Sequence, residues 1–97
     1  MIKRDNQYSL KEAIEQLIRA YGFQDKLLET TLIDSWETVV GGVYAAHTEN
    51  LKVKNRTLFV RIDSPALRQE LAMQRSELVR KLNDKAGKKV IDEIVFR

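Results

Sequence analysis

The stretch that decides the fold is "LKVKNRTLFVRIDSP", residues 51–65. Apolar and polar residues alternate on both sides of Asn55-Arg56, and a period of two is typical of strands that bury one face. Asn tolerates the positive φ of a two-residue hairpin turn, although Arg in second place is less favourable than Gly. The stretch therefore predicts a hairpin over residues 51–62 with one apolar face, made of Leu51, Val53, Leu58, Val60 and Ile62.

The residues after the hairpin predict a helix and a returning strand. Ser64 is a good N-cap, and Pro65 suits the first helical position because its missing N–H is not needed there. Four leucines then fall within ~60° of one another at 100° per residue, which predicts one continuous helix that Gly87 ends. The segment "KVIDEIVF", residues 89–96, predicts the last strand. The four leucines are Leu67, Leu71, Leu78 and Leu82.

Two helices are expected before the hairpin. Ser9 and Glu12 form a capping box that predicts the start of the first helix, and Gly22 is placed to end it. Its apolar residues recur at helical spacing: Leu10, Ile14, Leu17 and Tyr21.

The second helix is predicted from about Gln24 to Val40. Each Gly in a helix costs about 1 kcal/mol relative to Ala, so Gly41-Gly42 indicates a break, a kink or a close helix contact, followed by a short helix to Ala46. The apolar stripe expected on this segment is Leu28, Leu32, Trp36, Val39 and Val43.

The predicted order is α-α-β-β-α-β, an α+β fold. A hairpin, a crossover helix and a returning strand make a small three-stranded mixed sheet with helices packed on one face. No repeat and no Gly/Ser-rich linker interrupts the 97 residues, so we expect a single domain over residues 1–97.

The charge distribution is uneven along the chain. Residues 1–50 hold 5 Lys/Arg against 8 Asp/Glu, whereas residues 51–97 hold 12 against 6. A basic half is a candidate for an acidic partner, with nucleic acid first, although a solvated surface is an equal alternative. No apolar run approaches the ~20 residues of a membrane span, and the first ten residues lack the apolar core of a signal peptide. We therefore expect a cytoplasmic protein without membrane contact.

Catalytic and metal sites have little support in the sequence. The chain has no Cys and one His, whereas metal sites need several converging ligands. His47 has no partner in any catalytic motif, and Gly41-Gly42 fits no phosphate-binding motif. We expect His47 to be a hydrogen-bonded structural residue and Trp36 to lie in the core. The sequence predicts no enzyme, no catalytic residue, no cofactor, no metal and no small-molecule substrate.

The cations of the second half are the better functional signal. Lys52, Lys54 and Arg61 share the polar face of the predicted hairpin with Phe59. Two arginines seven residues apart would point within ~20° of each other on one continuous third helix, and two guanidinium groups are suited to bind phosphates. The alternative is that their stems cover the edge of the sheet. The predicted nucleic-acid-binding residues are Lys52, Lys54, Arg56, Arg61, Arg68 and Arg75.

Several short motifs in order resemble one known family. They are Trp36, Val40-Gly41, Ala45-Ala46-His47-Thr48, the hairpin Leu51 to Val60, Ser64 to Leu71, Leu82-Asn83 and Ile94-Val95-Phe96-Arg97. Over about residues 10–97 the chain resembles the DciA-like family, partners or loaders of the bacterial replicative helicase DnaB.

The resemblance implies a KH-like domain that binds DNA, single- or double-stranded and with little base specificity, and that contacts the replicative helicase. It implies no catalytic residue. The G-x-x-G loop with which KH domains clamp nucleic-acid backbone is absent, and Leu67 stands where the family often has Trp. Two other functions stay open: a protein-interaction adaptor without nucleic acid, and an RNA-binding protein associated with translation.

Overall fold

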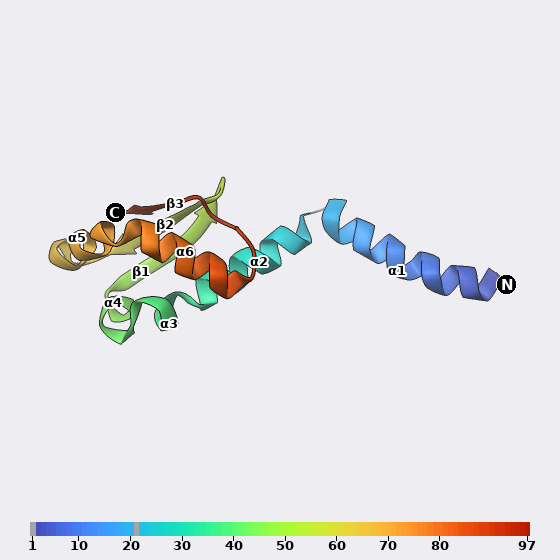
Figure 1. Ribbon diagram of the computed structural model, residues 1–97, viewed down its shortest axis with the longest axis horizontal. Coiled ribbons are helices and arrows are strands. Elements are labelled where there is room, and N and C mark those ends of the chain that lie inside the picture. Colours follow the sequence, from blue (N-terminus) through green and yellow to red (C-terminus); the bar gives the residue numbers. More distant parts are fainter. Residues whose placement is uncertain (1, 21) are drawn as a thin grey trace.

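The computed structural model describes the backbone of residues 2–20 and 22–97, and the side chains of residues 9–17, 19 and 22–97. Its described residues form a row of helices, a hairpin, two further helices and a final strand (Figure 1). In chain order these are α1 (Ile2–Ala20), α2 (Phe23–Asp34), α3 (Trp36–Val40), α4 (Gly42–Ala46), β1 (Thr48–Lys54), β2 (Thr57–Ile62), α5 (Pro65–Met73), α6 (Arg75–Ala86) and β3 (Glu93–Phe96).

The three strands form one mixed sheet in the order β1-β2-β3. β1 pairs with β2 antiparallel, and β2 pairs with β3 parallel. The parallel pair needs a crossover, which α5 and α6 supply. The α+β class and the mixed sheet predicted from the sequence are confirmed.

The hairpin turn lies where the sequence predicts it. Asn55 and Arg56 both have positive φ, 51° and 60°, as a two-residue turn that matches strand twist requires. β1 begins three residues earlier than predicted, at Thr48, and a bulge between Thr48 and Asn50 shifts its register.

The core lies between the sheet and the helices, against one sheet face. Leu58, Val60 and Ile62 of β2 are at most 1% exposed. Full burial of one such side chain contributes about 1.5–3 kcal/mol. The helices and the segment before β3 supply the rest of the core: Leu32, Trp36, Leu71, Leu78, Leu82, Ile91 and Ile94.

The predicted second helix is interrupted at Ser35, so the prediction of one helix to Val40 is wrong. The Ser35 hydroxyl donates to the carbonyls of Thr31 and Leu32, both at 2.9 Å. A hydroxyl that bonds the preceding turn competes with the regular helical pattern. Gly41 then turns the chain at φ 93° and leaves Val43 67% exposed, so Val43 does not belong to the buried stripe.

The predicted third helix is also two helices, because the chain bends at Gln74. Gln74 has φ −107° and ψ 16°, and its N–H donates to the carbonyl of Leu71 at 3.0 Å, a tighter turn than the α-helical one. The apolar stripe survives the bend, since Leu71, Leu78 and Leu82 are all buried.

The last strand is shorter than the predicted segment 89–96, and begins at Glu93. Asn83 of α6 explains the late start. Its amide oxygen accepts from the N–H groups of Val90 and Ile91 at 2.9 and 3.0 Å, and its amide nitrogen donates to the carbonyl of Ile91 at 2.9 Å. Backbone groups satisfied by Asn83 are not available for strand pairing.

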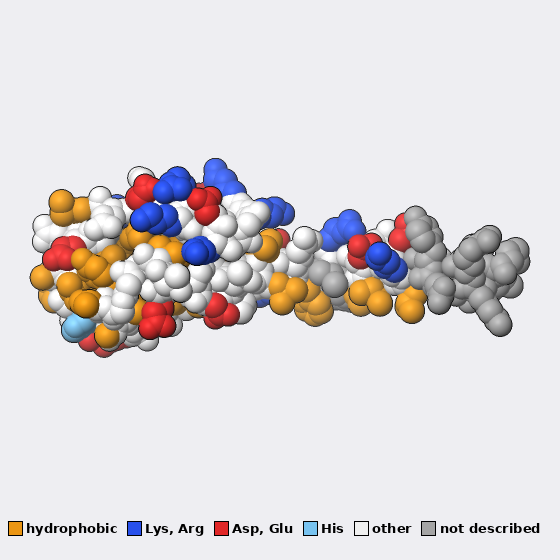
Figure 2. All heavy atoms as spheres, turned by 60° about the horizontal axis from the view of Figure 1, so that its bottom comes forward, with side chains coloured by type: hydrophobic (Ala, Val, Ile, Leu, Met, Phe, Trp, Pro, Cys, Tyr) orange, Lys and Arg blue, Asp and Glu red, His pale blue; other side chains and the backbone are white. Residues whose placement is uncertain are grey.

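Helix α1 projects from the rest of the molecule (Figure 1), and with this helix the whole molecule measures 65 × 22 × 21 Å. It begins at Ile2 rather than at the predicted cap Ser9, because residues 2–8 contain no Pro or Gly to stop a helix. Tyr21, the fourth member of the predicted stripe, lies outside the described residues. The other three members are exposed: Leu10 62%, Ile14 48% and Leu17 50%. Figure 2 shows the row of hydrophobic side chains along this helix.

Candidate nucleic-acid interface

The sheet face opposite the core, which we call the open face, carries three of the six predicted basic residues: Lys52, Lys54 and Arg61. Strand pairing places Lys52 of β1, Phe59 of β2 and Val95 of β3 in one row across the sheet. Side chains alternate between faces along a strand, and the neighbours of these residues, such as Leu58 and Ile94, are buried in the core. The row therefore faces away from the helices.

The two lysines of the open face are available to an anion. Lys52 and Lys54 are exposed, and no ion pair within the described residues engages either ammonium group. Arg61 lies on the same face and pairs with Glu49 at 3.2 Å, with side-chain exposures of 65% and 52%. An ion pair this exposed is worth about 0–1 kcal/mol, so a phosphate could compete with Glu49 for Arg61.

Arg97 extends the open face beyond β3. Its N–H donates to the carbonyl of Val60 at 2.8 Å, and its carbonyl accepts from the N–H of Ile62 at 2.9 Å. These bonds continue the parallel pairing. The guanidinium carbon lies 4.8 Å from the centre of the Phe59 ring, within cation–π range. Sequence reasoning placed Phe59 on this face but missed Arg97. The alternation of side chains along β3, continued by one residue past Phe96, would have placed Arg97 on the open face.

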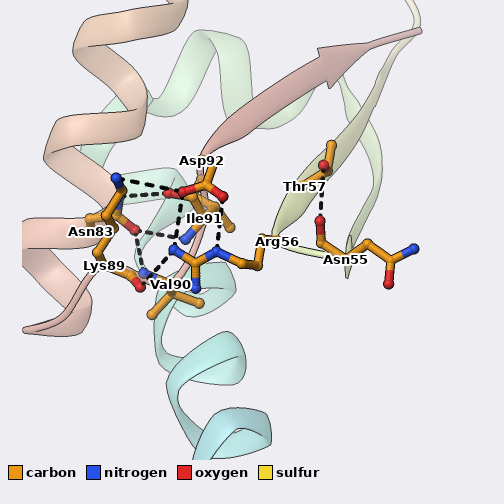
Figure 3. A network of polar contacts seen from close by, with 8 residues as sticks. All are labelled: Asn55, Arg56, Thr57, Asn83, Lys89, Val90, Ile91 and Asp92. Atoms are coloured by element: carbon orange, nitrogen blue, oxygen red, sulfur yellow. Dashed lines mark hydrogen bonds and ion pairs between the residues drawn. The ribbon is translucent and has the colours of Figure 1, made fainter.

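Arg56 is occupied by contacts within the protein (Figure 3). Its guanidinium donates to both carboxylate oxygens of Asp92, at 2.9 and 3.0 Å, and to the carbonyl of Lys89 at 3.2 Å. These hydrogen bonds lower the pKa of Asp92 below its ordinary value and raise the pKa of Arg56. Arg56 thus ties the hairpin turn to the segment before β3, a structural role that the sequence did not indicate.

The predicted pairing of Arg68 with Arg75 is wrong, because the bend at Gln74 puts them on different helices. Arg68 is half-buried and donates to the carbonyl of Ile62 at 3.0 Å. Arg75 is exposed, with its guanidinium carbon 5.8 Å from the centre of the Phe96 ring. The structure brings neither of them to the open face, since Ile62 and Phe96 belong to the side that packs on the core. Their guanidinium groups instead contact the sheet, at the Ile62 carbonyl and at the Phe96 ring.

The segment with the Trp, the His and the Gly pair is architectural. The indole N–H of Trp36 donates to the hydroxyl of Thr48 at 3.0 Å, and that hydroxyl donates to the carbonyl of Tyr44 at 2.9 Å. His47 Nδ1 lies 2.7 Å from a carboxylate oxygen of Asp63. Both contacts fix the point where the chain enters β1, as predicted for His47, and Trp36 is 2% exposed.

Metal and membrane sites find no support in the described part of the chain. No group of three or more His, Cys, Asp or Glu side chains there could hold a metal ion. Among the same residues, no helix combines the length and the hydropathy that crossing a bilayer demands.

Comparison with known proteins gives the family. The family described as "Dna[CI] antecedent, DciA" matches residues 9–96. The chain belongs to the DciA family. It is also similar to a "UPF0232 protein" of Corynebacterium glutamicum (strain R), with 27% identity over 86 residues. That alignment covers 89% of this chain and 48% of the relative, so the chain spans about half the length of the curated relative. No solved structure matches the chain.

The residues matched by the DciA family include both the projecting helix α1 and the sheet. It begins at Ser9 in the projecting helix and ends at Phe96 in the last strand. The exposed apolar row of α1 and the open face both fall within it, except for Arg97, which is the next residue. The family resemblance expected from the ordered motifs is confirmed.

Proposed function

We propose that this DciA-family chain is a non-enzymatic DNA-replication accessory domain. In this proposal residues 1–97 form one KH-like domain in the cytoplasm that binds nucleic acid and contacts the replicative helicase. Family membership supports the helicase-loading role in general. The observation that carries nucleic-acid binding is the open face, where Lys52, Lys54, Arg61 and Arg97 surround one aromatic ring.

The charge of the open face suits a phosphate backbone. Four cations stand there against two carboxylates, Glu49 and Glu93, of which Glu49 already pairs with Arg61. Lys52 and Lys54 are two residues apart on one strand, about 6.6 Å. Contacts of this type release counterions and carry little sequence information. The proposal therefore predicts salt-dependent binding with little base preference.

The six residues predicted from the sequence divide into two groups in this proposal. Lys52, Lys54 and Arg61 are direct phosphate contacts. The other three, Arg56, Arg68 and Arg75, have contacts within the protein and lie off the open face. We propose that they support the fold and add only long-range positive charge.

The surface proposed for the helicase is the apolar row of α1 and the start of α2. Exposed apolar rows of this kind typically mark protein contacts. Ile14→Ser with Leu17→Ser should then abolish co-elution with the replicative helicase while leaving nucleic-acid binding intact. Co-elution at the parental level would refute this assignment. The exposed residues of the row are Leu10, Ile14, Leu17, Phe23 and Leu27.

The test of nucleic-acid binding is a titration of DNA at several salt concentrations. Lys52→Glu with Lys54→Glu should weaken binding for all sequences alike and lower the log–log salt slope by about 1.4–1.8, because each lost contact contributes about 0.7–0.9. The matched control is Lys26→Glu with Lys81→Glu, which makes the same charge change at exposed positions on α2 and α6.

Four outcomes separate the functions. Loss of binding in the open-face variant but not in the control supports the proposal. Equal loss in both variants means that only net charge matters, and no binding by the parent favours the protein-interaction adaptor. Tighter binding to RNA than to DNA of the same sequence would favour the translation-associated function.

A further inference from the structure

We infer that Phe59 and Arg97 form a stacking platform that takes one base of a single-stranded nucleic acid. The inference deepens the proposed function and rests on it, because it assigns the open face to a single strand rather than a duplex. The phosphates would lie on the lysines of β1, and the base would lie on the guanidinium plane above the ring.

The ring is held in place before any ligand arrives. Phe59 is half-buried in the central strand, with Lys52 beside it on β1 and Val95 beside it on β3. A side chain fixed in this way loses little conformational entropy when a ligand binds. Because the ring lies in the middle of the face, a strand that approaches from either edge of the sheet can place a base near it.

The guanidinium is placed as the upper layer of the platform. Arg97 lies 4.8 Å above the Phe59 ring centre, its backbone is fixed by two hydrogen bonds to β2, and the residue is exposed. The guanidinium carbon lies over the ring, and the exposure of Arg97 leaves the group accessible to a ligand. Arginine planes stack on bases much as aromatic rings do, so the pair presents a flat, cationic surface.

Stacking distinguishes a single strand from a duplex. In a duplex the base faces are already stacked inside the helix, whereas an unpaired base offers its whole face. An acidic protein surface would use the cations of the open face but would have no use for a flat stack. The charges around Phe59 therefore fit a strand whose phosphates contact Lys52 and Lys54 and whose base turns toward the ring.

The platform can be tested without removing a charge or an apolar side chain. Phe59→Leu keeps an apolar residue but loses the aromatic face, and Arg97→Lys keeps the charge but loses the plane. Each variant should bind a single-stranded oligodeoxynucleotide at least about fivefold more weakly, since base–aromatic stacking is worth about 1–3 kcal/mol by alanine substitution. Binding to a blunt duplex of the same sequence should change less than about twofold in both variants.

A spectroscopic probe reports stacking directly. An oligodeoxynucleotide with 2-aminopurine at one position should lose fluorescence when the parent protein binds, and should keep it with Phe59→Leu or Arg97→Lys at saturation. Circular dichroism melts confirm that the variants are folded, and the probe on the parent remains informative even if one variant is not. Absence of quenching at every probe position in the parent would overturn the platform.

The two proposals fail in different ways. If the parent binds no DNA, the nucleic-acid function itself is wrong, and if Lys52→Glu with Lys54→Glu binds DNA as the parent does, the open face is not the binding surface. If that variant loses binding while Phe59→Leu and Arg97→Lys bind single strands at the parental level, the platform is wrong and the basic face stands. Equal losses on single strand and duplex would also refute stacking, because stacking is available only to unpaired bases.

Discussion

Replacement of Asn83 by Ala should destabilise the protein more than its partly exposed position suggests. The Asn83 side chain makes three hydrogen bonds to the segment before β3, two with the N–H groups of Val90 and Ile91 and one with the carbonyl of Ile91. At about 0.5–1.5 kcal/mol each, their loss costs about 3 kcal/mol. Ala is the better helix former by about 0.5 kcal/mol, which leaves about 2.5 kcal/mol.

The assay is thermal and urea unfolding of the parent, Asn83→Ala and a control. For a domain of this length, 2.5 kcal/mol corresponds to a fall of about 10–20 °C in melting temperature. The control is Asn50→Ala, which removes the same atoms from an exposed position on β1 and should change stability by less than about 0.5 kcal/mol. Hydrogen exchange should also accelerate at the amides of Val90 and Ile91.

The result that would refute this reasoning is a loss in Asn83→Ala no larger than in Asn50→Ala. In that case the hydrogen bonds of Asn83 would be replaced by water at no cost, and the segment before β3 would be held by Ile91 in the core. A large loss without faster exchange at Val90 and Ile91 would equally contradict it, because the destabilisation would then come from elsewhere.

Two further predictions follow from the core and from the clamp at the hairpin turn. Trp36→Ala should lower the free energy of unfolding by about 3–5 kcal/mol. Because domains of this size are stable by only about 5–15 kcal/mol, circular dichroism should show a largely unfolded chain. A folded variant that had lost only binding would show that Trp36 acts as a contact residue. Arg56 lowers the pKa of Asp92, so that pair should stabilise the fold above about pH 4 and lose its effect as the pH falls through the lower, folded-state pKa. The urea midpoint of Asp92→Asn should therefore fall less steeply in acid than that of the parent, and identical profiles would show that the pair does not contribute.

Much of the fold could be predicted from local patterns, but the breaks within the helices could not. Alternation around Asn55 located the hairpin because a strand reveals its period within a few residues. The breaks at Ser35 and Gln74 were not predicted, since neither residue is a strong helix breaker. The helices on both sides of each break contribute to one core, and this tertiary packing is not recorded in any local pattern.

The sequence predicted which face of the sheet carries the candidate site, but not all of the residues that belong to it. Lys52, Lys54 and Arg61 follow from alternation alone. Arg56 was chosen for its charge, yet its partner Asp92 is 36 residues away and could not be inferred from spacing. Alternation continued past Phe96 would have placed Arg97 on this face, but its contact with Phe59 depends on β3 pairing parallel to β2.

The bulge and the two lysines of β1 also bear on self-association. β1 is an outer strand of the sheet, seven residues long, and among the described residues no strand pairs with its far side. Such an edge can recruit the same edge of a second molecule, and proteins discourage this with bulges and lysines. The bulge after Thr48 and the charges of Lys52 and Lys54 supply both devices. With glutamate at these two positions, two β1 edges would still repel each other. Alanine would remove the repulsion and favour edge-to-edge aggregation. Charge reversal is therefore the substitution whose effect on nucleic-acid binding is not confused with a loss of solubility.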